Sequence, residues 1–131
     1  MQYAFRCYGH PNLRAKHTKT LEFTRAEDLT LTGTCIIGVR ADFDPAALHA
    51  LSGKVRVTLT VGELTETFTA VINRHFEHDE ELVFRRGAFA SPRTLGIYCS
   101  KVAIGVNRDL IARLRDPATE MLVTIEEIGK R

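Results

Sequence analysis

Alternating apolar and other residues recur along the chain and predict a mainly β structure. Apolar side chains occupy every second position over residues 55–61 and again over residues 121–125. A period of two is typical of a strand that buries one face. A further strand is predicted over residues 65–72, where Phe68, Ala70 and Ile72 keep the same period. It follows the turn at Val61-Gly62-Glu63, so these two strands are expected to form a hairpin.

Two short helices are predicted, one before each of the strands at 55–61 and 121–125. Asp44 stands where an N-cap is expected, with Pro45 at the first helical position, and the helix is expected to run to Leu51. The second helix is predicted from Asn107, its N-cap, to Leu114. The chain therefore contains helices, but strands dominate it.

The two halves of the chain repeat one order of features. Each half has an Asn, a His five residues later, and an apolar-rich triplet four residues after that His: Asn12, His17 and Leu21-Glu22-Phe23, then Asn73, His78 and Leu82-Val83-Phe84. An apolar run, a short helix and a strand follow in both halves. We therefore expect two diverged copies of a strand-strand-helix-strand unit, over approximately residues 10–62 and 67–128, within a single domain of residues 1–131.

The repeat predicts how the sheet is arranged. Two units with one buried face each are best stabilised by a pseudo-two-fold β-barrel or closed sheet, because closure removes exposed strand edges. Barrels of the cradle-loop type have this order of elements, which supports the barrel by analogy. An open α+β sheet is the alternative.

Composition adds limits to this architecture. The length of 131 residues suits one domain with a continuous core, and 44% apolar and 26% charged residues are close to globular averages. Apolar stretches such as residues 35–39 are too short to cross a bilayer, and the first residues lack a signal-peptide pattern. A cytoplasmic protein without a membrane partner is therefore expected.

The three cysteines, Cys7, Cys35 and Cys99, are widely spaced and form no Cys-x-x-Cys pair. Neither a zinc knuckle nor a redox motif is indicated, and reduced thiols are expected. Cys35 opens an apolar run and is expected to be a small buried residue without a catalytic role.

The net charge of +2 is too small to indicate nucleic-acid binding by itself. Its distribution is uneven, because residues 6–25 are mainly basic and residues 77–81 are mainly acidic. The two halves therefore differ in electrostatic character.

Two stretches of the first half resemble a known family. They are Gly9-His10-Pro11-Asn12-Leu13-Arg14-Ala15-Lys16-His17-Thr18-Lys19-Thr20-Leu21-Glu22 and Gly33-Thr34-Cys35-Ile36-Ile37-Gly38-Val39-Arg40-Ala41-Asp42. They are similar to the pattern of a mainly archaeal family catalogued as domain of unknown function 371, and the later Arg85-Arg86 and Arg93-Thr94-Leu95 also fit it. The resemblance covers essentially the whole chain. It implies an intracellular protein of archaeal type, and it brings no activity with it.

The chain departs from that family pattern at two positions. Lys19 stands in place of a threonine, and Thr34 stands in place of an acidic residue before Cys35. The resemblance therefore implies no role for a carboxylate at position 34.

The turn Gly9-His10-Pro11-Asn12 is the first candidate site, because such a turn presents polar side chains at the surface. His10 and His17 are candidate general bases, and with Asp42 they could also form a metal site of imidazoles and a carboxylate. Their spacing matches no known ligand pattern, so the spacing by itself does not indicate a metal. The alternative is that these side chains only stabilise local turns.

The second half offers its own histidines. His75 and His78 flank Glu77, and either they form a second polar site or this segment is a solvated acidic turn. If the two halves are related by a pseudo-two-fold axis, His17 and His78 could line one cleft, or they could lie at opposite ends of the domain. The sequence leaves both possibilities open.

Basic side chains suggest an anionic ligand. The ligand-binding candidates are Asn12, Arg14, Lys16, Arg40, Arg85 and Arg86, and Lys19 and Arg93 have the same chemistry. A single-stranded RNA would also need exposed aromatic rings, for which Tyr3, Phe5, Tyr8 and Tyr98 are the candidates. Solvated lysines and arginines on strand faces are the alternative interpretation.

Three functions remain open. The leading hypothesis is an intracellular binding module that holds an anionic small molecule, a nucleotide or RNA in a cleft between the loop from Gly9 to His17 and the Arg40–Asp42 strand end. The alternatives are a small hydrolase-like enzyme with His10 or His17 as general base, with or without a metal, and a scaffold subunit. No P-loop, serine elbow or dinucleotide fingerprint is present, which disfavours NTP hydrolysis by a Walker motif, acyl transfer by serine and Rossmann cofactors, and the sequence leaves the cofactor unknown. The first half has His10, Arg14 and Arg40, whereas the second half has acidic residues instead and Lys101 at the position that corresponds to Asp42. One working half and one supporting half are therefore expected.

Overall fold

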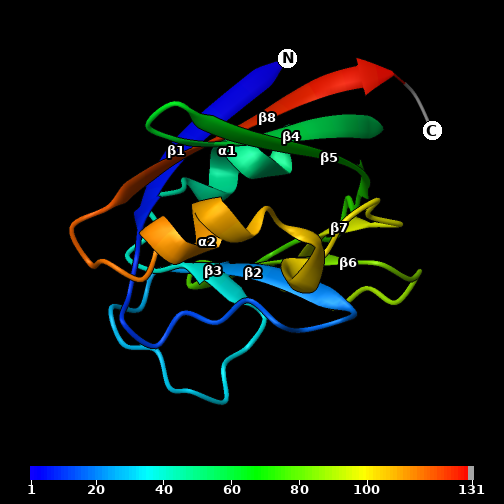
Figure 1. Cartoon of the computed structure of the whole chain (residues 1–131). Helices are drawn as coiled ribbons and strands as arrows, with labels where there is room; N and C mark the ends of the chain where they lie inside the picture. Colours follow the sequence, from blue (N-terminus) through cyan, green and yellow to red (C-terminus); the bar gives the residue numbers. More distant parts are fainter. Residues whose placement is uncertain (130–131) are drawn as a thin grey trace.

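The computed structural model describes residues 1–129 and contains one mixed sheet of eight strands (Figure 1). The strand order is β1-β8-β4-β5-β7-β6-β2-β3. The strands are β1 (Gln2–Tyr8), β2 (Thr20–Thr24), β3 (Ile36–Gly38), β4 (Lys54–Val61), β5 (Leu64–Ile72), β6 (Glu81–Arg85), β7 (Thr94–Ile97) and β8 (Glu120–Gly129). The predicted mainly β class is confirmed.

The hairpin predicted around Gly62 is present. β4 and β5 pair as antiparallel neighbours over their whole length, from Val61 opposite Leu64 to Lys54 opposite Val71. Gly62 has a φ of 57°, in the left-handed region that tight hairpin turns require and that glycine adopts without strain. The alternating residues of β4 bury Val55, Val57, Leu59 and Val61, as the period of two predicts.

The strand β1 was not predicted. Phe5 and Cys7 are buried and the intervening Arg6 is exposed, so a short period-two pattern was present in the sequence. β1 pairs with β8 in antiparallel register, with Gln2 opposite Glu126. Each half therefore has three strands before its helix, instead of the two that were expected in the repeating unit.

The expected closed barrel is wrong, and the open α+β sheet that was its alternative fits the structure. The edge strands β1 and β3 meet at one bridge, where Tyr8 N donates to Val39 O at 2.8 Å. β3 contains only three residues, and Arg40 then adopts a φ of 51°, which turns the chain away. Among residues 1–129 no longer ladder joins the two edges, so the sheet bends strongly but remains open (Figure 1).

The two predicted helices are confirmed, each somewhat shorter than expected. They are α1 (Pro45–His49) and α2 (Arg108–Arg113), and a short 3-10 helix, η1 (Ala103–Gly105), was not predicted. Both N-caps are as expected, because the Asp44 carboxylate accepts from Ala46 N and the Asn107 side chain accepts from Asp109 N and Leu110 N. No helix within residues 1–129 is long and apolar enough to cross a membrane.

The strand pairing of one half matches that of the other. β2 and β6 are antiparallel neighbours, and each also has a parallel partner, β3 or β7. The remaining strands correspond as well, because β1 pairs with β8 and β5 pairs with β4. The backbone conformations of Arg40 and Tyr98 agree too, with φ of 51° and 53° two residues after Gly38 and Gly96.

Aromatic rings fill the interior of the bent sheet. Phe23 packs edge-on against Phe5 and Phe84, with ring centroids 5.3 and 6.3 Å apart, and Phe84 packs in the same way against Phe68. Beside Phe84 the packing leaves no room for another carbon, since a Cβ on Gly96 would lie 2.5 Å from Phe84 Cδ1. This dense core holds β2 and β6 in a fixed register, and these two strands position the polar groups described next.

Candidate functional site

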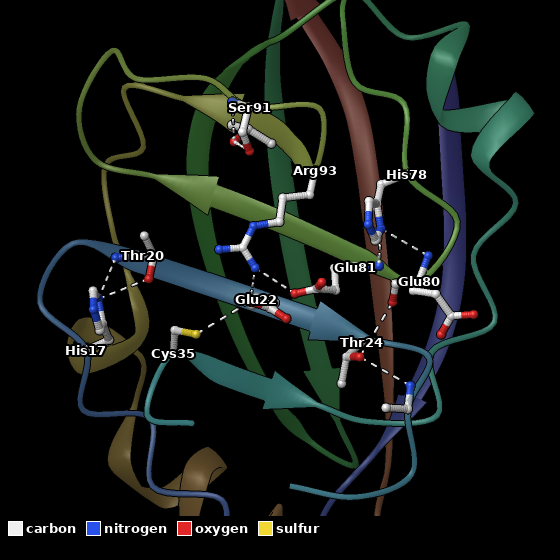
Figure 2. A network of polar contacts seen from close by, with 12 residues as sticks. His17, Thr20, Glu22, Thr24, Cys35, His78, Glu80, Glu81, Ser91 and Arg93 are labelled. Atoms are coloured by element: carbon white, nitrogen blue, oxygen red, sulfur yellow. Dashed lines mark hydrogen bonds and ion pairs between the residues drawn. The ribbon is translucent and has the colours of Figure 1, made fainter. Parts of the chain in front are cut away.

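A polar network lies on the outer face of β2 and β6 (Figure 2). In β2, Leu21 and Phe23 are buried in the core, and because strand residues alternate, Glu22 points to the opposite face. There it meets Cys35, which precedes β3, and Glu81 and Arg93, which lie at the start of β6 and just before β7. We call Glu22, Cys35, Glu81 and Arg93 the carboxyl–thiol network.

The contacts of the carboxyl–thiol network converge on Glu22. The Cys35 thiol lies 3.5 Å from Glu22 Oε1, and Arg93 Nη1 lies 3.8 Å from the same oxygen. Arg93 Nη1 donates to Glu81 Oε1 at 2.6 Å, which is a charge-assisted hydrogen bond. Glu22 is 5% exposed, whereas the side chain of Arg93 remains 43% exposed. The network therefore has a buried carboxyl group beneath a guanidinium that reaches solvent.

Burial and the neighbouring carboxyl of Glu81 raise the pKa of Glu22 to about 7. For Glu81, burial acts in the same upward direction, but hydrogen bonds from Glu22 and Arg93 outweigh it and lower the pKa. Of the two carboxyl groups, Glu22 is therefore the one that is protonated more readily. Burial and the carboxyl of Glu22 also raise the pKa of the Cys35 thiol to about 11, so this thiol is not an activated nucleophile at neutral pH.

Cys35 differs from its expected environment. It is intermediate in exposure and donates to a carboxyl group, whereas Cys7 and Cys99 are buried. The difference arises because Cys35 lies before the buried part of β3 and points toward Glu22, on the outer face. All three cysteines are free thiols.

His17 and His78 play matching local roles. His17 Nδ1 accepts from the backbone N of Lys19 and Thr20, at 3.2 and 3.1 Å. His78 Nδ1 accepts from the backbone N of Glu80 and Glu81, at 3.2 and 2.9 Å. Each ring thus closes the turn that leads into β2 or β6. Because those strands are antiparallel, the two histidines lie at opposite ends of the strand pair, away from each other (Figure 2).

The Gly9-His10-Pro11-Asn12 turn is stabilised from within. Asn12 N donates to His10 Nδ1 at 3.0 Å, and the Asn12 side chain donates to Leu29 O at 2.8 Å. Asn73 has the same role in the second half, since its side chain donates to Thr94 O at 2.9 Å. Gly9 is packed so tightly that a Cβ there would lie 2.2 Å from Leu114 O.

The structure does not gather His10, His17 and Asp42 into one site. The carboxylate of Asp42 accepts from Arg6 N at 2.7 Å, beside β1, while the two histidines serve separate turns. Within residues 1–129 no group of three or more His, Cys, Asp and Glu side chains is placed to hold a metal ion.

A basic cavity of about 430 Å³ lies between the loop after β1 and α2. Its lining consists of four cationic residues and three apolar ones: Arg14, Lys16, Arg108, Arg115, Leu13, Ile111 and Ala112. The loop contributes Arg14 and Lys16, and a φ of 52° at Ala15 turns the chain between them. No carboxylate lines the cavity. We call this pocket the basic cavity.

Arg108 is anchored at the rim of the basic cavity. Its guanidinium donates to Val106 O, Ala15 O and Ala103 O, at distances of 3.0 to 3.1 Å. The bond to Ala15 O ties the loop to the start of α2. The charge of Arg108 is thus held in place without neutralisation by a carboxylate.

Arg40 lies apart from Arg14 and Lys16. Its guanidinium stacks on the Tyr8 ring, 4.3 Å from the centroid, and donates to Pro117 O at 2.7 Å. It lines a different cavity of about 500 Å³, together with His10, Glu27 and Asp28. The single cleft expected between the Gly9–His17 loop and the Arg40–Asp42 strand end is therefore divided into two.

Arg85 and Arg86 lie at the end of β6. Arg85 Nε donates to Thr94 Oγ1 at 2.8 Å, and its guanidinium lies 4.9 Å from the centroid of the Phe89 ring. Arg86 N donates to Lys19 O at 3.0 Å, which connects this region to the basic loop of the first half.

The acidic turn of the second half borders a third cavity, of about 410 Å³. Glu77, His78 and Asp79 line it from the loop, and Pro45, Ala46 and His49 line it from α1. This cavity and the basic cavity are built alike, each from the loop before a central strand of one half and the helix of the other half. Their charges are opposite.

Sequence reasoning missed several of these residues. Arg108, Ala112 and Arg115 follow the i, i+4, i+7 spacing of one helix face, which was a readable signal for two cations on one side of α2 and of the turn that follows it. Glu22, a charge between two apolar residues, signalled an outward-facing strand position. Nothing local in the sequence indicated that Arg93 would lie beside it.

The aromatic candidates are mostly covered. Phe5 is buried, and Tyr3 and Tyr8 are half-buried, so the expectation that they are exposed is wrong for Phe5. Tyr98 is exposed, at 47%, as expected. Phe89, which had not been considered as a surface ring, is 68% exposed.

The protein is of the α+β class, with one open, eight-stranded mixed sheet and two oppositely charged cavities. The chain belongs to the family described as domain of unknown function DUF371, whose profile matches residues 5–128. It is 31% identical over 125 residues to the uncharacterized protein MJ0206 of Methanocaldococcus jannaschii, a match that covers 88% of this chain and 93% of that protein.

Proposed function

We propose that this protein is an intracellular binding module for an anionic, phosphate-bearing ligand, and that the basic cavity is its binding site. The observation that carries the proposal is the lining of that cavity by four cationic side chains without a carboxylate. Arginine and lysine donors of this kind suit phosphate oxygens, which accept several hydrogen bonds at once.

The cationic groups differ in how much of their bonding capacity remains for a ligand. Arg108 uses its donors on backbone carbonyls and supplies mainly a fixed charge. Arg14 has one bond to a carbonyl, Pro11 O at 3.3 Å. The side chains of Lys16 and Arg115 have no hydrogen-bond or ion-pair partner within residues 1–129. These two residues are the best direct contacts for a ligand, and Arg14 is the third.

The proposal includes an internal duplication followed by divergence. The matching strand pairs and the matching roles of His17 and His78 support two related units, over approximately residues 10–62 and 67–128. Of the two corresponding cavities, only the one formed by the first-half loop is basic. This supports one ligand-binding half and one supporting half.

The test is a titration of the purified protein with inorganic pyrophosphate at low salt, in which isothermal calorimetry measures the binding. Lys16→Ala and Arg115→Ala should each weaken binding by about tenfold or more, since a hydrogen bond to a charged group contributes about 1.5–3 kcal/mol. Binding should also weaken as salt is raised, because the contacts are electrostatic.

Arg113→Ala is the matched control. Arg113 is the last residue of α2, two positions before Arg115, but it pairs with Glu63 and does not line the cavity. Arg113→Ala removes one positive charge, as Lys16→Ala and Arg115→Ala do. An effect that depended only on net charge would therefore weaken pyrophosphate binding equally in all three variants. Pyrophosphate binding that is absent, or that all three variants reduce alike, would refute the proposed site.

A further inference from the structure

We propose that the ligand of the basic cavity is a single-stranded nucleic acid, with backbone phosphates along residues 14–19 and a base stacked on Phe89. This inference rests on the proposed function and extends it from one cavity to a longer surface. It draws on three observations: an exposed aromatic ring, three cationic side chains between residues 14 and 19, and two segments without acidic residues.

The Phe89 ring is held ready for stacking. It is 68% exposed, and the Arg85 guanidinium lies over it, 4.9 Å from the ring centroid. Arg85 is itself fixed by its bond to Thr94 Oγ1. Tyr98 is also exposed, and its backbone N donates to Gly87 O at 3.1 Å. Tyr98 therefore lies close to the segment that carries Phe89. Exposed rings of this kind beside arginine are what single-strand binding surfaces use to stack bases.

The basic cavity connects to this aromatic region through the chain itself. Lys16 lines the cavity, and Lys19 O, three residues further, accepts the hydrogen bond from Arg86 N. Three residues span at most roughly 10 Å, so the cationic groups at the two ends are close neighbours on the scale of an oligonucleotide. Lys16, Lys19 and Arg86 are all exposed.

Two of the three segments that form this surface carry no acidic residue, and the third, from Arg108 to Arg115, contains Asp109. Residues 9–21 contain three Lys or Arg and residues 85–108 contain five, and neither segment contains Asp or Glu. Two of the eight cations are paired elsewhere, Arg93 with Glu22 and Glu81 and Lys101 with Glu66. The other six remain without a carboxylate partner among residues 1–129: Arg14, Lys16, Lys19, Arg85, Arg86 and Arg108.

These features favour a single strand over a duplex. A base can stack on Phe89 only if its face is free, and bases in a duplex are covered by their neighbours. Inorganic phosphate or pyrophosphate has no base, so it would use the basic cavity without the aromatic ring. The ring therefore distinguishes the ligand classes.

The experiment measures fluorescence anisotropy of labelled oligouridine, oligodeoxythymidine and a duplex, with calorimetry of pyrophosphate binding in parallel. Phe89→Ala should weaken single-strand binding about 5- to 150-fold, the loss expected for one stacked base, and leave pyrophosphate binding unchanged. Arg115→Ala should weaken both. Comparison of the affinities for oligouridine and oligodeoxythymidine shows whether the protein prefers RNA or DNA.

Leu31→Ala is the matched control, because Leu31 is another exposed apolar residue, 57% exposed, outside this surface. If Phe89→Ala binds the single strand like the wild type, or if the duplex binds as tightly as the single strand, this inference is overturned. The proposed function then stands as long as pyrophosphate binding still depends on Arg115. Loss of pyrophosphate binding altogether would overturn both.

Discussion

The carboxyl groups of Glu22 and Glu81 lie on adjacent antiparallel strands and both face Arg93 Nη1, at 3.8 and 2.6 Å. They are diagonal neighbours, because Glu22 is opposite Val83 and Glu81 is opposite Thr24. Arg93 bonds to Glu81 and approaches Glu22 from the same side. Burial and Glu81 raise the pKa of Glu22, whereas Arg93 lowers that of Glu81, so Glu22 is the carboxyl of the pair that binds a proton more readily.

Glu22→Gln should make the protein more stable at high pH than the wild type. The pKa of Glu22 is raised in the folded state from 4.5 to about 7, chiefly by burial. The stability that protonated Glu22 contributes is therefore fully present when the pH is below the pKa of the unfolded state. It is then lost as the pH rises through about 7. Glutamine mimics the protonated acid. The advantage of the variant should grow between about pH 5 and pH 8 to about 1–3 kcal/mol.

Urea unfolding across this pH range measures that advantage. Glu126→Gln serves as the control, because Glu126 is a more exposed carboxylate paired with Arg56. A stability difference between Glu22→Gln and the wild type that does not depend on pH would contradict the raised pKa of Glu22.

One thiol per chain should react with a disulfide reagent in the native protein. Cys7 and Cys99 are 0% and 4% exposed, whereas Cys35 is intermediate. The reaction of Cys35 should be slow at neutral pH and accelerate strongly toward alkaline pH, because burial raises its pKa to about 11. Absorbance of the released thiolate measures both the number and the rate.

Cys35→Ser should abolish native labelling, and denaturant should expose all three thiols of the wild type. Rapid native labelling of Cys35→Ser would show that a buried cysteine is accessible and would contradict the packing around Cys7 or Cys99.

His17→Ala and His78→Ala should destabilise the protein to a similar degree. Each substitution removes the Nδ1 acceptor of two backbone N–H groups at the start of a central strand. The expected cost is about 1–3 kcal/mol, the penalty for leaving buried or partly buried donors without a partner. Urea denaturation measures it, and His75→Ala is the control because only its backbone N is engaged. An unchanged His17→Ala midpoint would exclude this role.

Gly96→Ala should be strongly destabilising, and Gly87→Ala should be nearly neutral. A Cβ on Gly96 would lie 2.5 Å from Phe84 Cδ1 and 3.0 Å from Ala70 Cβ, whereas one on Gly87 meets nothing within 4 Å. Overpacking of a core typically costs about 1–3 kcal/mol. Thermal unfolding followed by circular dichroism compares the two. Equal midpoints would mean that β6 and β7 can separate without loss of packing.

Local patterns in the sequence were sufficient for several elements. The strands at residues 55–61 and 65–72, the Gly62 hairpin and the Asp44 and Asn107 caps depend on side chains within a few residues of one another. Periodicity and capping chemistry report such short-range interactions directly. The repeated spacing of His17 and His78 also corresponded to a repeated local contact.

Only the tertiary structure decided whether the sheet closes and which charges meet. The sheet stays open because β3 is three residues long and Arg40 turns the chain, a balance that no single segment expresses. Arg14 and Arg115 share a cavity, and Glu22 and Arg93 share the carboxyl–thiol network, although long stretches of sequence separate each pair. Side-chain patterns within a segment specify which face is buried, whereas the partner across the fold depends on the packing of all segments together.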